Sequence, residues 1–262
     1  MKFVPKELKE TADISRGTVT WVSALKNVAS VVLVLALLYL GLGLTADLLA
    51  SLIPEELESS FMVWDVETPD AEDPEFQRAQ AIFDRLLEQP GLRPLPYRLF
   101  LLNFSEPNAV AVPGGGVGVS PALLKLVTSE TGLALVLSHE LGHHQGRHTL
   151  KRLGRALLYR GTMALLFAGS GSSVVNMSLK AAHSSYSRGQ EQEADEFGIR
   201  LVNRVYGHTR GALEFFEDMA AEQNGSVGRW ASFLASHPFT EDRIADLQQL
   251  QEQLNPGARA PR

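Results

Sequence analysis

The sequence predicts a mainly helical α+β domain with a small β-sheet, preceded by one N-terminal transmembrane helix. The transmembrane helix is predicted by an uncharged run of 20 residues, 27–46. At about 1.5 Å per residue, such a helix spans the ~30 Å hydrocarbon core of a bilayer. No polar stripe interrupts the run, which argues against a buried core helix. Further along the chain, segments with helical apolar spacing alternate with short segments rich in Val and Gly that are typical of strands.

Composition narrows the class of protein. The chain has 262 residues and a formal net charge of -6, so it lacks the cationic surplus that binding to nucleic-acid phosphates requires. It contains no cysteine, which excludes disulfides and cysteine-ligated metals. His, Asp and Glu therefore remain as the common metal ligands.

The charges beside the apolar run predict its direction. Cations stand on its N-terminal side, at Lys2, Lys6, Lys9, Arg16 and Lys26. On its other side no Lys or Arg occurs before Arg78. Because positive charges stay in the cytoplasm, residues 1–26 are expected inside and the rest outside. This corresponds to a single-pass protein of the bacterial inner membrane with a periplasmic domain. A cleaved signal peptide is the alternative, although its apolar core usually has only ~7–15 residues.

Beyond the apolar run, the chain divides into a linker, a domain and a tail. Residues 47–74 are acidic and contain three prolines, which predicts a linker. The domain is expected over 75–254 and the tail over 255–262. The predicted elements of the domain are a helix over 74–88, a strand over 97–104, a hairpin over 108–119, helices over 121–127, 130–143 and from 187, and a C-terminal helix. Pro113 removes a hydrogen-bond donor from the hairpin, which predicts an edge position for its first strand.

The helix predicted over 130–143 carries the pattern His-Glu-Leu-Gly-His. His139 and His143 lie four residues apart, so they share one face and can bind one metal ion. Glu140 lies one residue further round the helix, where it can reach a water on that ion but is poorly placed as a ligand. This position predicts a general base. The flanking residues are apolar, and polar side chains on a buried helix need such a reason.

A second helix offers the ligand that two histidines leave missing. Glu191 and Asp195 lie four residues apart and share a face, so Glu191 can complete the ligand set. Asp195 can accept the spare N–H of a ligating histidine. The spacing alone does not separate Glu191 from Glu193 as the ligand, and Glu193 is otherwise expected to be solvated.

These motifs resemble metallopeptidase family forty-eight, which includes HtpX and the CAAX prenyl endopeptidases. The resemblance rests on His-Glu-Leu-Gly-His at 139–143 and Ser-Arg-x-x-Glu-x-x-Ala-Asp at 187–195. The segment 108–115 is similar to the family's Asn-Ala-Phe-Ala-x-Pro-Gly-Gly strand, with Val110 in place of the aromatic residue. The single apolar span is closer to single-anchor bacterial envelope peptidases than to the prenyl proteases.

The resemblance implies a zincin-like fold of the gluzincin type and one Zn²⁺ per chain, held by His139, His143 and Glu191. It also implies that Asp195 is the partner of a ligand. In the family, substrate is thought to lie along the edge strand. That strand corresponds here to Asn108, Ala109, Val110, Ala111 and Val112.

His237 lies in a Ser-His-Pro loop before the C-terminal helix. It is interpreted either as a donor to the oxyanion of the reaction, as an occupant of the open zinc position, or as a loop histidine bonded to backbone. Arg243 is expected to anchor this loop to an acidic partner. His144 and His148 are expected to flank the metal helix without touching the metal.

The resulting functional hypothesis is a zinc endopeptidase that cleaves internal bonds of misfolded or membrane-associated proteins in envelope quality control. Membrane lipid around the N-terminal helix is the other expected partner. One alternative is a non-catalytic chaperone-like or binding module that keeps the zinc site for stability. Another is a membrane-embedded processing enzyme, which would require residues 161–179 to enter the membrane.

Overall fold

The computed structural model describes residues 20–61, 73–167, 186–223, 230–238 and 240–255. The chain forms two compact units, Met1–Leu44 and Thr45–Arg262. Helix α1, Trp21–Leu52, begins in the first unit and ends in the second. In the described part of the chain, α1 is the one helix long and apolar enough to cross a membrane. Its apolar side chains are exposed, as at Leu35 with 59% of its surface accessible, so α1 is not the buried core helix of a globular protein.

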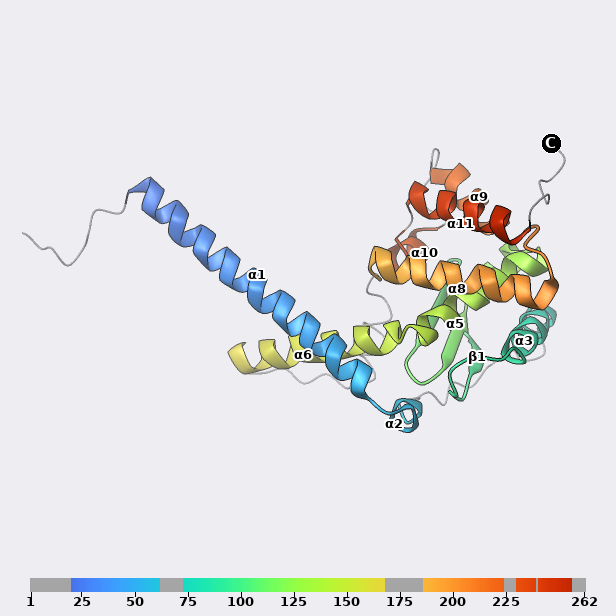
Figure 1. The fold of residues 1–262 in the computed structure, drawn as a ribbon, viewed down its shortest axis with the longest axis horizontal. Helices are drawn as coiled ribbons and strands as arrows, with labels where there is room; N and C mark the ends of the chain where they lie inside the picture. The colour runs from blue at the N-terminus through green and yellow to red at the C-terminus, as the bar shows by residue number, and fades with distance from the viewer. Residues whose placement is uncertain (1–19, 62–72, 168–185, 224–229, 239, 256–262) are drawn as a thin grey trace, which may run out of the picture. The chain divides into compact units, whose positions relative to one another are not determined.

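A three-stranded sheet lies in the second unit (Figure 1). Its strands are β1, Arg98–Leu101, β2, Ala109–Val112, and β3, Gly116–Val119. β3 lies between the other two, antiparallel to β2 and parallel to β1. The predicted hairpin and the edge position of its first strand are therefore confirmed. The turn needs glycine because Gly114 and Gly115 have φ of 92° and 102°.

The strand expected over 97–104 is shorter in the structure and covers only four residues. Its last residue, Leu101, pairs with Val119, the final residue of β3. The next residue, Ser120, has left the strand to cap helix α4, Pro121–Leu126. Strand β1 therefore ends where its pairing partner ends.

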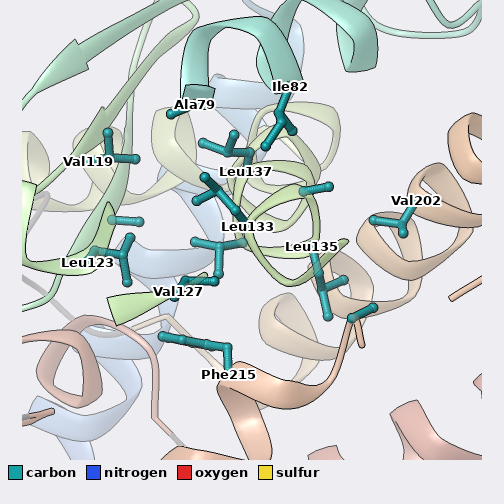
Figure 2. Close-up of a cluster of buried hydrophobic side chains, with 14 of the residues drawn as sticks. Ala79, Ile82, Val119, Leu123, Val127, Leu133, Leu135, Leu137, Val202 and Phe215 are labelled. Atoms are coloured by element: carbon teal, nitrogen blue, oxygen red, sulfur yellow. The ribbon is translucent and has the colours of Figure 1, made fainter. Parts of the chain in front are cut away.

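Helix α5, Glu130–Gln145, is the centre of the core. It packs against α3, Pro74–Leu87, against α8, Arg188–Tyr206, and against strands β2 and β3. Figure 2 shows three of its leucines pointing to different neighbours. Leu137 points toward α3, Leu135 toward Val202 of α8, and Leu133 toward Leu123 and Val127. Because apolar contacts surround it, α5 is buried along nearly its whole length.

The remaining helices complete the second unit. They are α2, Glu55–Ser59, α6, His148–Phe167, α9, Glu214–Gln223, α10, Ala231–Ser236, and α11, Glu241–Leu254. Helix α8 begins with a capping box in which Ser187 and Gln190 bond each other's backbone. Part of the run 161–179, together with residues 256–262 of the expected tail, lies outside the described residues.

The span expected to be a linker, 47–74, differs from that expectation where the structure describes it. Helix α1 continues to Leu52, and the short helix α2 follows. Glu58 of α2 is fully buried and pairs with Arg93 at 2.6 Å. Asp47 pairs with Arg155 of α6. The compact unit that begins at Thr45 therefore includes the described residues of this acidic span, which are held by distant partners that local composition does not reveal.

The packing of α5 on α8 depends on a glycine. A Cβ at Gly142 would lie 2.8 Å from the Cα of Ala194 and 2.9 Å from its carbonyl oxygen. Both are backbone atoms, so neither can move without moving α8. Gly142 therefore sets how closely the two helices approach.

We expect Gly142→Ala to lower the free energy of unfolding by about 1–3 kcal/mol, because the added methyl group forces α5 away from α8. Gly161→Ala is the matched control, since a Cβ there meets nothing within 4 Å. That control is expected to be neutral or to stabilise by up to ~1 kcal/mol, the helix propensity difference. Urea denaturation followed by circular dichroism would measure both. Equal stabilities of the two variants would contradict the close-packing interpretation.

Candidate active site

Four side chains from three parts of the fold meet in one buried cluster. His139 and His143 come from the last two turns of α5, Glu191 from the first turn of α8, and His237 from the residue that follows α10. One ligand atom of each lies within 4.8 Å of the others. All four residues are at most 2% exposed. The cluster thus unites both helices that the sequence motifs predict with the His237 loop.

The distances within the cluster suit one tetrahedral ion. The two Nε2 atoms of His139 and His143 are 3.1 Å apart. Glu191 places Oε1 at 3.5 Å from His143 Nε2 and Oε2 at 3.6 Å from His139 Nε2. His237 Nδ1 lies 3.2 Å from His139 Nε2 and 3.2 Å from Glu191 Oε1. Ligand atoms about 2.0–2.1 Å from a tetrahedral zinc are separated by about 3.3–3.4 Å, so these donors fit that metal.

Glu140 lies beside the ligands with both carboxylate oxygens buried. Its Oε1 is 3.4 Å from His237 Nε2, and within the described part of the chain neither oxygen accepts a hydrogen bond. A buried carboxylate is costly unless something polar compensates it. Glu140 is therefore placed to interact with a molecule that binds in the site. This is the position expected of a general base for a bound water.

Asp195 and Arg243 form a second layer around His139. Asp195 Oδ1 lies 2.9 Å from His139 Nδ1, so Nδ1–H can donate to it while Nε2 faces the cluster. Arg243 holds the same carboxylate by two bonds of 2.7 and 2.8 Å and contacts Glu191 at 2.6 Å. It also donates to the carbonyl of Pro238 at 3.0 Å. One buried arginine thus joins a metal ligand, the partner of another ligand and the His237 loop.

The other histidine of the motif has its own partner. His143 Nδ1 lies 3.0 Å from His148 Nδ1, and His148 Nε2 lies 3.0 Å from Glu193 Oε2. Tyr186 stacks on the imidazole of His143 with ring centroids 3.6 Å apart. His148, Glu193 and Tyr186 are residues for which sequence reasoning foresaw no such contact. Glu193 is 70% exposed, as solvation predicts, yet it reaches His148.

Burial and charge set the protonation of these groups. Burial would raise the pKa of Glu191, but charge interactions with His237 and bonds from His143 and His237 hold it well below its usual value. Burial also lowers the pKa of His143 well below the usual value. For His139, burial opposes the charged form, but the bond to Asp195 and the negative charges of Asp195, Glu191 and Glu140 together raise the pKa above its usual value. Glu191 and His143 are therefore in metal-binding forms, whereas protons compete with metal for His139 at acid pH.

The predicted substrate strand lies at the edge of the sheet, but it is buried. Asn108, Ala109, Val110, Ala111 and Val112 are each at most 5% exposed. The side chain of Asn108 donates to Ser232 at 3.0 Å, and its backbone N–H donates to Ser120 at 2.8 Å. Strand β2 packs against α5, the helix that carries the two histidines.

A buried His-His-Glu cluster on two packed helices, with a second glutamate beside it, defines a metal site of the zinc-peptidase type. Comparison with known proteins agrees. The family model described as Peptidase family M48 matches residues 73–251, more than half of the chain. The chain therefore belongs to peptidase family M48.

Several curated proteins are similar to this chain over part of their length. The mitochondrial metalloendopeptidase OMA1 of Schizosaccharomyces pombe is 27% identical over 64% of this chain and 50% of its own. The beta-barrel assembly-enhancing protease of Yersinia pestis is 30% identical over 69% of this chain and 40% of its own. The metalloprotease YcaL of Escherichia coli is 28% identical over 59% of this chain and 61% of its own. The chain thus spans 40% to 61% of the length of these three relatives.

We expect Glu191→Gln to lower the zinc content of the purified protein, because a neutral amide is a poorer ligand than a carboxylate. Glu196→Gln is the matched control, since Glu196 lies on the same helix, has a side chain that is 59% exposed, and pairs with Arg200 on the surface of that helix. Metal analysis after dialysis against a weak chelator would measure the zinc content of both variants. Unchanged zinc in Glu191→Gln would move the third ligand to another residue.

Proposed function

We propose that this protein is a zinc-dependent endopeptidase that hydrolyses internal peptide bonds of proteins. The observation that carries the proposal is the cluster of His139, His143 and Glu191 at distances that fit one tetrahedral ion, with Glu140 beside it. When bound, Zn²⁺ would polarise the scissile carbonyl and make a water acidic enough to act as the nucleophile near neutral pH. Side chains of the protein are proposed to perform the other steps, namely proton transfer and the orientation of the ligands.

Glu140 is proposed as the general base and later the general acid. It takes a proton from the attacking water and delivers it to the leaving nitrogen. Its buried carboxylate has no competing hydrogen bond among the described residues, so it is available for this transfer. Asp195 is proposed to keep the proton of His139 on Nδ1, which leaves Nε2 free to bind the metal.

His237 is proposed to occupy the fourth ligand position when no substrate is bound. Its Nδ1 lies at the same distance, 3.2 Å, from His139 and from Glu191. It follows the end of α10 and lies on a loop, so it can leave the metal more readily than a ligand on a helix can. Once displaced, it remains near Glu140, where a donor to the oxyanion would be useful.

Substrates are proposed to bind in extended form along Asn108–Val112. Strand addition recognises main-chain groups, so it suits varied sequences such as those of misfolded or membrane-associated proteins. The edge position of β2 and its packing on the metal helix support this assignment. The burial of β2 means that the edge must be uncovered before a substrate can pair with it.

We further propose that α1 anchors the protein in the bacterial inner membrane, with residues 27–46 in the bilayer and the peptidase domain in the periplasm. The flanking charges support this direction. A role in envelope quality control is suggested by the relatives named for β-barrel assembly. A chaperone-like module that keeps the metal site for stability is the alternative function.

We expect Glu140→Gln to keep its zinc and to lose peptide hydrolysis by at least about 100-fold, because the amide cannot accept the proton. Cleavage of an unfolded test protein, with and without a strong chelator, would measure this. The Glu196→Gln variant should cleave normally. Activity that resists the chelator would contradict the proposed zinc dependence, and activity that survives Glu140→Gln would remove Glu140 as the base. No cleavage by the wild type would favour the chaperone-like alternative.

The absence of cysteine allows a simple test of topology. We expect a cysteine in place of Glu217, on the exposed side of α9, to react with a membrane-impermeant maleimide in spheroplasts. A cysteine in place of Lys9 should react only after lysis. The reverse pattern would overturn the proposed direction. Loss of the Lys9→Cys label from the mature protein would indicate a cleaved signal peptide.

A further inference from the structure

We propose that His148 and Glu193 are positioning residues that fix the tautomer and the ring orientation of His143. The inference rests on the proposed zinc site and concerns how that site is built. His148 Nδ1 lies 3.0 Å from His143 Nδ1, and Glu193 Oε2 lies 3.0 Å from His148 Nε2. These contacts link a metal ligand to a carboxylate through an intervening imidazole.

The positions of the protons on His143, His148 and Glu193 follow from the proposed role of His143 as a metal ligand. Its Nε2 faces the ligand cluster and must offer a lone pair there, so its proton stands on Nδ1. This N–H donates to His148 Nδ1, which must be the unprotonated nitrogen of a neutral ring. The proton of His148 therefore stands on Nε2 and donates to the carboxylate of Glu193. Only one arrangement of protons satisfies all three groups.

The fold holds His148 in place from several sides. The ring is fully buried and follows directly after Arg147, which has a positive φ of 54°. Arg147 donates to the carbonyls of Ala50, Ser51 and Ile53 at the end of α1. The turn between α5 and α6 is thereby fixed in the conformation that brings His148 over His143.

A glycine makes room for the ring. A Cβ at Gly146 would lie 2.2 Å from His148 Nε2 and 2.5 Å from its Cε1. The backbone of Gly146 has φ of -78° and ψ of 0°, which any residue can adopt. An alanine there would therefore fit the backbone but displace the ring from its position between His143 and Glu193.

The two ligand histidines are thus oriented differently. His139 is in direct contact with Asp195, which is buried and held by Arg243. His143 reaches its carboxylate only through His148, and that carboxylate is 70% exposed. Partners of this kind typically contribute 10–100-fold to metal affinity. We expect His148 and Glu193 together to raise the affinity for zinc by a factor within this range.

The test is the affinity of the full-length protein for zinc, measured by competition with a chromophoric chelator, together with the unfolding of the metal-free protein in urea. His148→Leu should weaken zinc binding 10–100-fold. His148→Asn should recover part of the loss, because its amide oxygen can stand near the place of Nδ1 and accept the same proton. Gly146→Ala should weaken binding as His148→Leu does, whereas Gly161→Ala and Glu196→Gln should bind zinc normally.

The outcomes separate the proposals. Wild-type protein that fails to bind zinc would overturn the proposed function. Normal zinc binding by the wild type and by His148→Leu would overturn only the positioning role. Equal losses in His148→Leu and His148→Asn would exclude hydrogen bonding as the cause. Losses that follow the unfolding free energy of the metal-free variants would reduce His148 to a packing residue.

Discussion

The close contact between α5 and α8 is the constraint on which the site depends. No single helix supplies the ligand set, so the two helices must approach until His139, His143 and Glu191 reach one point. Glycine permits this approach on both helices. Gly142 of α5 faces the backbone of Ala194, and a Cβ at Gly198 of α8 would lie 3.2 Å from the backbone nitrogen of His139. A larger side chain at either glycine would push the two helices apart. The metal ligands would then move away from one another, although the new side chain does not contact them.

That approach also buries several charges together, which is tolerable only because they compensate one another. The negative side consists of Glu140, Glu191 and Asp195, and the buried cation Arg243 contacts two of these carboxylates. Buried ion pairs seldom add much stability compared with apolar packing, but an isolated buried charge is costly. The cluster is therefore better understood as a requirement of the chemistry than as a source of stability for the fold.

The metal helix and its partner could be predicted from the sequence because their information is local. Four-residue spacing on a helix brings His139 toward His143 and Glu191 toward Asp195, and Pro113 indicates the edge strand. Contacts between distant segments could not be predicted in this way. Glu58 lies in an acidic stretch typical of a linker, and only the fold brings Arg93 to it. Likewise, nothing in the spacing of His148 and Glu193 indicates that they meet. The fit of Gly146 against the imidazole of His148 is seen only in the structure, so the sequence carried no signal for this contact.

The burial of the candidate site has a kinetic consequence. The ligands and Glu140 are at most 2% exposed, and the strand beside them is covered. An extended polypeptide cannot enter such a site, so the proposed function requires the protein to exchange with an open form. The observed turnover is then the intrinsic rate multiplied by the open fraction. Any factor that binds the open form preferentially would act as an activator without touching a catalytic group, and the closed form would protect neighbouring proteins from unscheduled cleavage.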